Sequence, residues 1–391
     1  MYKYIQDEIR NNSRSVFRDL TRPQQKALGE VVRGLFTAGE PILRHIAQAP
    51  DKSAKRQGDK YSHHLGNVRT KDKIEDLALK KAKKSVRKTT VIAYDLTDIS
   101  KESALKIEKI SRVFDGSERR VTNGFLLHGV GINGILARFQ VHDGELFTTN
   151  QIRRKIVTEI SQDLGFKGIW VFDRGNDDRQ FFRFLRQNLK VGFIARLKAD
   201  RQAILIKTGA IIQVKSLKAG KYEVYLMKKN NNGADMSCKY TLVISNHLED
   251  KEPIRLIHSL KHSYSKNQIV MMYLERWGVE NIFKRVKDKF ELEKIRVLKY
   301  EKFVNLVALI QLAVLVSTIT FLKLQQSTNA LTIGVLMCYK KFLKFKTLGF
   351  NLDSFISFMK GCLKPLIQRI DKPPDQLNLF SHRQLEKLVP F

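Results

Sequence analysis

The chain has 391 residues, of which 71 are Lys or Arg and 39 are Asp or Glu, giving a formal net charge of +32. Hydrophobic residues make up 43% of the sequence, which excludes a disordered or fibrous chain and leaves room for two or three domains. Such unbalanced charge adds nothing to stability, so it indicates a polyanionic partner, either nucleic acid or an anionic membrane surface.

The three cysteines, Cys238, Cys338 and Cys362, lie far apart. None forms a C-x-x-C pair, which argues against a zinc ribbon, an iron–sulfur site or a disulfide framework. A reducing, cytoplasmic compartment fits this usage best. The N-terminal residues have no apolar run after their charges, so we expect no signal peptide.

One apolar stretch, residues 303–322, is long enough to span a membrane. It contains Asn305 and Gln311, and it stands alone in the sequence. A helix buried inside a soluble protein has the same composition. We therefore expect a buried helix and no membrane anchor.

Residues 1–88 are polar and show helical periodicity. Asp19 or Thr21 can cap a helix that starts near Pro23 and continues with apolar residues at helical spacing. Residues 51–88 are more basic than the chain average, with few apolar residues to bury. This part is either a basic arm that orders on a polyanion or a solvated linker, and the two readings are evenly balanced.

From residue 89 the periodicity changes to that of strands. TTVIAYDLTD predicts a buried strand, and two further strand-like runs meet at Asn133-Gly134, a strong hairpin signal. The elements predicted next are a helix over 150–164, a strand ending in VFDRG, a helix near 178–188 and the strand VGFIARLK. The order β-β-β-α-β-α-β over residues 89–199 predicts an α/β core.

Residues 200–265 interrupt this alternation. Their segments alternate polar and apolar residues as strands do, with turn signals between them, which predicts a β-rich insertion. After it we predict one long helix, roughly Lys266–Val297. Residues 266–322 would complete the core with this helix and the buried one, and residues 323–391 would form a helical C-terminal region.

The predicted long helix has an unusual polar stripe. At 100° per residue, five polar side chains fall within about 80° of one another: Tyr273, Arg276, Glu280, Lys284 and Lys287. An apolar stripe lies beside it, formed by Val279, Ile282, Phe283, Val286 and Phe290. The polar stripe presents one carboxylate among cations, although Glu280 and Lys284 also have the spacing of an ordinary helix salt bridge.

Two aspartates shift the balance toward a functional site. Asp95 and Asp173 each follow a buried strand-like run, where side chains emerge at the carboxyl end of a sheet. Carboxylates gathered there repel one another unless a cation neutralises them, and Mg²⁺ or Mn²⁺ prefers such oxygen ligands. Two such ions can promote in-line attack at phosphorus.

These segments together resemble the DDE transposases of bacterial insertion sequences, in the group marked by Y-(2)-R-(3)-E-(6)-K. Tyr273, Arg276, Glu280 and Lys287 match that spacing at all four positions. YDLTD resembles the family's first-aspartate strand and VFDRG the second, in the expected order. The resemblance covers roughly residues 89–322 and implies a ribonuclease-H-like core, with the β-rich segment as the family's insertion.

The resemblance also implies roles. Asp95, Asp173 and Glu280 would be catalytic and bind two Mg²⁺ ions, for which Mn²⁺ can substitute. Tyr273, Arg276, Lys284, Lys287, Arg174 and Trp277 would contact DNA. The partners would be double-stranded DNA, both the element's terminal inverted repeats and the target, held by a homodimer. A bacterial, nucleoid-associated protein is implied, with residues 1–88 recognising the DNA ends.

Several residues keep two readings. Trp277 lies beside the polar stripe and is either a DNA contact or a surface residue, whereas Trp170 precedes a buried strand and is expected in the core. His128 and His142 lack metal-ligand spacing and are expected as surface or strand histidines. The glycines of GVGING lie between two strands, which excludes a nucleotide-binding loop.

Three alternatives to a transposase remain open. A DNA-binding relative without catalysis would keep the basic surface and the fold. A metal-dependent nuclease would use the same carboxylates but never join strands. A membrane-associated basic protein would use residues 303–322 as its anchor.

Overall fold

The computed structural model describes residues 2–47, 53–104, 106–116, 118–228, 233–246, 252–326 and 330–370. The chain divides into two compact units. The helical unit combines Met1–Ile74 with Arg285–Phe391, and the sheet unit is Glu75–Lys284. The part of the predicted C-terminal region after residue 370 lies outside the described residues, as do Asn231 and Asn232 of the insertion.

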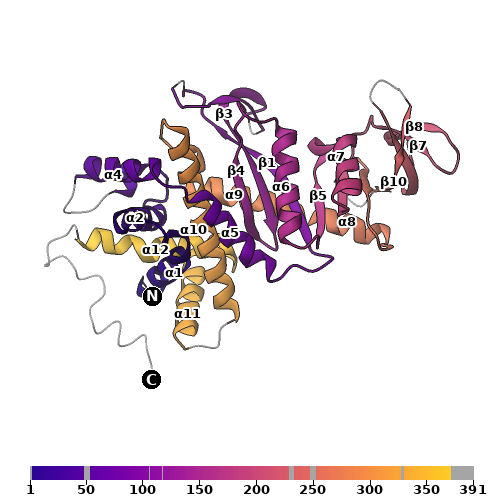
Figure 1. Ribbon diagram of the computed structural model, residues 1–391. Coiled ribbons are helices and arrows are strands. Elements are labelled where there is room, and N and C mark those ends of the chain that lie inside the picture. The colour runs from indigo at the N-terminus through magenta and orange to yellow at the C-terminus, as the bar shows by residue number, and fades with distance from the viewer. Residues whose placement is uncertain are drawn as a thin grey trace. The chain divides into compact units, whose positions relative to one another are not determined.

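The described strands of the sheet unit form one sheet (Figure 1). They are β1 (Val91–Ser100), β2 (Ser111–Asp115), β3 (Arg120–Ile132), β4 (Ile135–Val141), β5 (Ile169–Phe172), β6 (Gly192–Arg196), β7 (Gln202–Leu205), β8 (Ile211–Gln213), β9 (Gly220–Met227), β10 (Ala234–Ser245) and β11 (Ile254–His258). The helices of this unit are α6 (Thr149–Asp163), α7 (Arg179–Arg183), α8 (Lys266–Leu274) and most of α5 (Lys71–Lys83) and α9 (Trp277–Phe290).

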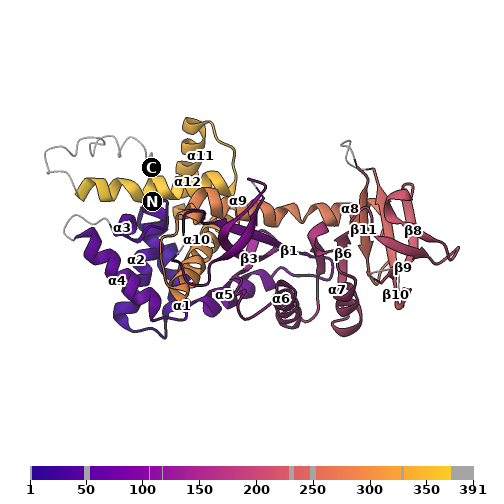
Figure 2. The same ribbon diagram turned by 90° about the horizontal axis from the view of Figure 1, so that it is seen from above.

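Five strands make the core in the spatial order β4-β3-β1-β5-β6. β5 runs parallel to β1 and β6, whereas β3 pairs antiparallel with β1 and β4. Helices α6 and α7 lie on one side of this sheet, and α8 and α9 lie on the other (Figure 2). This arrangement confirms the predicted α/β, ribonuclease-H-like core.

The β3–β4 hairpin forms where the sequence predicts it. Asn133 and Gly134 connect the strands with φ angles of 49° and 77°. Positive φ at both central residues is the mark of the tight turn whose twist matches that of paired strands, and Asn-Gly adopts it at little cost.

The insertion strands extend the core sheet at one edge. β11 pairs antiparallel with core strand β6, and β10, β9, β7 and β8 follow outward in that order. β11 and β2 were not among the predicted strands. Each is only five residues long and contains arginine, so pairing with a neighbour, and not local sequence, decides that they are strands.

The prediction of one helix over Lys266–Val297 was wrong. α8 ends at Leu274, and α9 runs only from Trp277 to Phe290. Between them the backbone hydrogen bonds tighten to three-residue spacing: the Arg276 amide donates to the Tyr273 carbonyl at 3.1 Å. Because a tighter turn advances the chain by more than 100° per residue, the calculated stripe does not run unbroken through Arg276.

The helical unit is built around α10 (Tyr300–Gln326), which packs against every other long helix of the unit. These are α1 (Tyr2–Phe17), α2 (Arg22–Ala38), α4 (Ala54–Gly66), α11 (Ala330–Lys346) and α12 (Leu352–Ile370), with the short α3 (Leu43–Ile46) beside them. Thr21 begins α2, as one of the two predicted caps, and its amide donates to Gln24 at 3.0 Å. The five helices within residues 1–88 confirm the helical prediction there.

α10 is the apolar helix that the sequence singled out. Among the described residues it has the length and apolarity of a membrane span, but 94% of its most apolar window is buried in the protein. Asn305 is buried on it and donates to the carbonyls of Leu65 (3.0 Å) and Val68 (2.9 Å). These bonds satisfy a polar group inside the core, so the helix is a buried one, as predicted.

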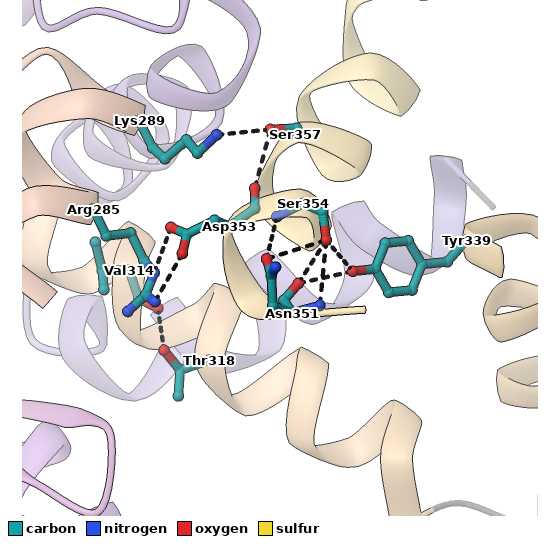
Figure 3. Close-up of polar contacts among 9 residues, drawn as sticks. All are labelled: Arg285, Lys289, Val314, Thr318, Tyr339, Asn351, Asp353, Ser354 and Ser357. Atoms are coloured by element: carbon teal, nitrogen blue, oxygen red, sulfur yellow. Dashed lines mark hydrogen bonds and ion pairs between the residues drawn. The ribbon is translucent and has the colours of Figure 1, made fainter. Parts of the chain in front are cut away.

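Polar contacts join α9 and α12 inside the helical unit (Figure 3). Arg285 donates two hydrogen bonds to Asp353, at 2.8 and 3.1 Å, and Lys289 donates to Ser357 at 3.1 Å. Asn351 caps α12 by accepting from the Ser354 amide at 2.9 Å. A two-bond arginine–carboxylate pair fixes orientation as well as distance, so these contacts fix where α12 lies on α9 within this unit.

Candidate active site

The alternation of side chains along the parallel strands places two carboxylates together. Tyr94 of β1 is the register partner of Phe172 of β5, so Asp95 and Asp173 follow at adjacent positions on neighbouring strands. Val171 belongs to the apolar cluster that packs on α8. Because side chains on a strand repeat every second residue, the carboxylate of Asp173 emerges on the face covered by α8 and α9.

Two glycines of β3 bring α9 close to this point. Gly129 is the cross-strand partner of Asp95, and a methyl group added there would overlap the ring of Phe283 on α9. At Gly131 an added methyl would meet Val279 at 3.1 Å. Gly129 and Gly131 therefore let the apolar stripe of α9 pack closely on β3; the stripe was predicted correctly and is buried.

Arg276 joins the two parts of the site. Its guanidinium donates to Asp95 Oδ2 at 2.8 Å and forms a short ion pair with Glu280. The Arg276 side chain is 8% exposed, whereas that of Glu280 is 48% exposed. Arg276 thus links Glu280 to Asp95, while the side chain of Glu280 remains open to solvent.

The pKa of Asp95 reflects this crowding. Burial, followed by the negative charge of Asp173, raises the pKa of Asp95 to about 7, although Arg276 opposes the shift. The pKa of Arg276 is raised because Tyr273, Asp95 and Glu280 outweigh the effect of its burial. A buried carboxyl group whose pKa is so perturbed is typical of a functional site.

Asp173 is oriented by residues that the sequence analysis did not identify. Asn176, three residues later, donates a short hydrogen bond to Asp173, and Arg153 of α6 donates to Asn176 at 2.8 Å. Arg153 also bonds Asp178 at 3.1 Å and lies 3.8 Å from the centre of the Phe181 ring. Arg153 is an arginine within the apolar stripe of α6, next to Ile152 and Ile156, and this was the available signal of a buried charge with a positioning role.

A second buried chain lies beneath Asp95. Tyr94 and His128 share a 2.6 Å hydrogen bond, and His128 contacts His142 at 3.2 Å. Burial lowers the pKa of His128 to about 3, so the ring is neutral at physiological pH. His128 is a buried residue of β3, as predicted, whereas His142 directly follows β4 and is half-buried.

The remaining sequence-predicted residues separate into buried and exposed groups. Tyr273 is 3% exposed within the core cluster, and Arg276 lies over its ring at 5.5 Å. Trp277, Lys284 and Arg174 are exposed, near Arg276, Glu280 and Asp173 in sequence. Lys287 is also on α9 but falls in the helical unit, where it pairs with Glu293 at 3.3 Å.

The aromatic candidates of the core are buried, as expected for Trp170. Its indole nitrogen donates to Ser161 at 3.0 Å, and the side chain is 1% exposed. Trp277, at 45% exposure, is the accessible tryptophan of the two.

The side chains of this site are of the chemical type that binds a hard divalent cation. Asp95 and Asp173 supply carboxylate oxygens, and the raised pKa of Asp95 measures a repulsion that a cation would relieve. Within the residues that the structure describes, no three His, Cys, Asp or Glu side chains stand close enough together to hold a metal ion. Glu280 pairs with Arg276, which in turn pairs with Asp95.

Comparison with known proteins shows the family of the chain. The family model described as "Transposase DDE domain" matches residues 86–316, more than half of the chain. The chain therefore belongs to the DDE transposases, a family of DNA-cutting and DNA-joining enzymes. No curated protein matches it.

One similar solved structure is a piggyBac transposase synaptic complex with hairpin DNA, determined by cryo-EM. It is 12% identical to this chain, with a TM-score of 0.48, over 100% of this chain and 82% of that one.

Proposed function

We propose that this transposase cuts DNA at the terminal inverted repeats of its own element and joins the resulting 3′-hydroxyl ends to target DNA. It would belong to the bacterial insertion-sequence group with the Y-(2)-R-(3)-E-(6)-K signature, which Tyr273, Arg276, Glu280 and Lys287 match in spacing. The observation that carries the proposal is the adjacency of Asp95 and Asp173 on parallel strands, with Glu280 tied to them through Arg276.

Asp95, Asp173 and Glu280 would be the catalytic carboxylates. The family uses divalent metal ions, and we propose two Mg²⁺ ions per site, with Mn²⁺ as a substitute. Bound there, the ions would supply an activated oxygen nucleophile and charge stabilisation at phosphorus. The protein's own contribution is to hold the carboxylates: Asn176 orients Asp173, and the Leu96 amide donates to Asp95 at 2.8 Å.

Arg276 has two roles in this proposal. Without metal it neutralises Asp95 and Glu280, which lets three acids exist near one another inside a folded protein. When Glu280 turns toward the carboxylates, the guanidinium becomes available to a DNA phosphate, which it can bind through two donors. Tyr273, buried beneath it, supports the guanidinium through its ring face.

The exposed residues near the carboxylates would contact DNA. Lys284 and Arg174 offer cations to the backbone, and Trp277 offers a ring on which a base can stack. Lys287 would add a phosphate contact from the same helix. These assignments rest on exposure and on their nearness in sequence to the acidic residues.

The wider organisation is proposed on the same basis. Residues 1–88 would recognise the element's ends, residues 89–199 and 266–322 would make the catalytic core around the β-rich segment 200–265, and residues 323–391 would complete the helical part. Two copies would act together, because two DNA ends must be held at once. The protein would work in the cytoplasm, on the nucleoid.

The test is a cleavage assay on a plasmid that carries the gene's own flanking DNA. We expect cuts at defined ends only with Mg²⁺ or Mn²⁺, and none from Asp173→Asn or Glu280→Gln. Glu275→Gln is the matched control, because Glu275 is an exposed acid five residues before Glu280 and is not one of the three proposed catalytic carboxylates. It should cut as the wild type does.

Each other outcome has a definite meaning. Equal cutting by the wild type and the two site variants would show that these carboxylates are not catalytic. Binding without cutting by any version would identify a DNA-binding relative. Cutting without joined products would identify a nuclease.

A further inference from the structure

The residues that directly follow Asp173 connect it to the β-rich segment 200–265. They lead into α7, which lies between β5 and the strands of that segment (Figure 1). Asn176 donates a hydrogen bond to Asp173. The next residue, Asp177, accepts hydrogen bonds from the chain that leads from β6 into the β-rich segment. A continuous set of polar contacts therefore runs from this segment to Asp173 through two neighbouring residues.

The contact between Asp177 and Arg201 is extensive. Arg201 Nε donates to both carboxylate oxygens of Asp177, at 3.0 and 3.2 Å, and Nη2 donates to Oδ1 at 2.7 Å and to the Asp177 carbonyl at 3.0 Å. The Lys198 amide donates to Oδ2 at 2.9 Å. A guanidinium that bonds both oxygens of a carboxylate fixes its direction as well as its distance. Residues 198–201 therefore determine where Asp177 lies.

Two largely buried ion pairs fasten this part of the chain to the β-rich segment. The Asp177 side chain is 0% exposed and that of Arg201 is 19% exposed. Two residues after Asp177, Arg179 pairs with Asp235 of β10, and these side chains are 17% and 7% exposed. A buried ion pair is costly to break because the remaining charge has little water to replace its partner. The connection is thus stiff.

The backbone between Asp177 and Asp173 is short and hydrogen-bonded. Arg174–Asn176 forms a single 3-10 turn, in which the Asn176 amide donates to the Asp173 carbonyl at 3.2 Å. A methyl group added at Gly175 would lie only 3.2 Å from a carboxylate oxygen of Asp173. Because closely packed groups transmit displacement, a shift of Asp177 would move Asn176 and, with it, the hydrogen bond that orients Asp173.

We propose that Asp177 and Arg201 are positioning residues for the carboxylate of Asp173, and that the β-rich segment thereby controls how tightly the site binds its metal ions. This inference rests on the proposed function, in which Asp173 is a metal ligand. Contacts that orient a ligating carboxylate raise metal affinity, so a segment that shifts and loosens Asp177 lowers it. By linkage, a metal ion bound by Asp173 stabilises the turn of residues 198–201.

The experiment measures Mn²⁺ binding by the full chain without DNA, from the electron paramagnetic resonance signal of free Mn²⁺. Arg201→Gln removes the contact with Asp177. Arg255→Gln is the matched control, because it removes another largely buried arginine and the same charge. Arg255 pairs with Glu252 at 3.6 Å and donates to the Pro253 carbonyl at 3.2 Å, within the β-rich segment.

We expect Arg201→Gln to raise the Mn²⁺ dissociation constant by about 10-fold, the lower end of the effect of supporting contacts at metal sites. Arg255→Gln should leave it unchanged. Asp177→Asn is a milder second variant, because asparagine keeps the shape and an acceptor for the Lys198 amide but loses the charge that holds Arg201. It should weaken Mn²⁺ binding in the same direction. Urea unfolding gives the stability of each variant, and lower stability with unchanged Mn²⁺ binding would show a purely structural contact.

Hydrogen exchange tests the connection in the opposite direction. Mn²⁺ should slow exchange of the Lys198 amide, which donates to Asp177, in the wild type and in Arg255→Gln but not in Asp173→Asn. This follows because the coupling between the metal and the turn is reciprocal. Exchange at this amide that Mn²⁺ leaves unchanged in the wild type would overturn control by the β-rich segment.

Asp173→Asn separates failure of this inference from failure of the proposed function. If it weakens Mn²⁺ binding while Arg201→Gln and Asp177→Asn behave as the control does, the positioning role is overturned and the metal site stands. If Asp173→Asn binds Mn²⁺ as the wild type does, Asp173 is not a ligand and both proposals fail. Weaker binding by Arg201→Gln and Asp177→Asn, with DNA cleavage restored at saturating Mn²⁺, supports the positioning role.

Discussion

The two ends of the sheet in the sheet unit carry opposite charge. Where the parallel pairing of β1 with β5 ends, Asp95 and Asp173 lie at adjacent positions, and the buried Arg276 pairs with Asp95. Where β6 begins, Arg186, Lys190 and Lys261 surround a pocket with no acidic lining residue among those described. One set of parallel strands thus carries acidic side chains at one end and basic side chains at the other.

This contrast shows where a ribonuclease-H-like sheet can carry function. Strand ends differ from strand interiors because the backbone pairs there are incomplete and side chains meet loops and helix ends. The acidic end repels itself unless it is neutralised, and Arg276 provides this without metal. The cationic end has exposed lysines, so solvent screens much of its repulsion.

The largest effect is expected from a substitution that changes only the acidic end of the sheet. Asp173→Asn should lower DNA cleavage by at least about 10²–10³-fold, because the charge that stabilises the transition state would be lost. DNA binding, measured by fluorescence anisotropy, should change little, because the cationic end is untouched. A variant that still cuts at the wild-type rate would contradict the assignment.

The packing of α9 on β3 can be disturbed without changing any charge. Gly129→Ala should destabilise the protein by about 1–3 kcal/mol, because the new methyl group overlaps Phe283. Gly278→Ala is the control on α9, where nothing lies within 4 Å. It should be neutral or stabilise by up to about 1 kcal/mol, since alanine favours helix. Urea unfolding of both variants measures the difference, and equal stabilities would refute the close approach.

Asn176 tests whether Asp173 must be oriented. Asn176→Ala should raise the Mg²⁺ concentration needed for half-maximal cleavage by about 10–100-fold, as loss of a supporting hydrogen bond does at metal sites. Gln180→Ala, an exposed amide on the following helix, should leave it unchanged. A purely structural role would lower stability while the metal requirement stayed constant.

The smallest expected effect is on the pH dependence of stability, through the buried, neutral His128 below Asp95. His128 has an unfolded pKa near 6.5 and a folded pKa of about 3, so the unfolded chain binds its proton more readily. Its contribution to stability is complete above pH 6.5 and falls as the pH drops toward 3, by about 1.4 kcal/mol per unit. His128→Gln should lose stability less steeply than the wild type between pH 6.5 and 5. Parallel curves in urea unfolding would rule out this residue as the source.

Much of the acidic end was predictable because its signals are local. A β-branched run followed by Asp occurs at both Asp95 and Asp173, and it was enough to place them beside each other: Asp173 directly follows β5, and Asp95 follows the last β1 residue that pairs with β5, although β1 itself continues to Ser100. The apolar stripe of α9 and the Asn133-Gly134 turn are likewise short-range patterns, and both predictions were confirmed. Trp170 was expected in the core for the same reason.

Long-range contacts carry no such local signal. The continuous stripe from Tyr273 to Lys287 was predicted on uniform helical geometry, but the chain tightens at Arg276, leaving Tyr273 buried and Glu280 exposed. Arg153 bonds Asn176 and Asp178 from α6, a helix that only folding brings beside them. The cationic pocket gathers residues from three separated segments, so its charges look scattered in the sequence.

The sequence by itself determined the class of protein and the buried nature of α10, and it singled out Asp95, Asp173 and Glu280 as candidate site residues. Residue type, spacing and apolar periodicity are properties of neighbouring residues, and they can be read along the chain. Only the tertiary structure decided that Arg276 links Asp95 to Glu280, that two glycines seat α9, and that the far end of the sheet holds a cationic pocket. These depend on side chains meeting across the fold, where distance and burial determine charge, and neither is written in the order of the residues.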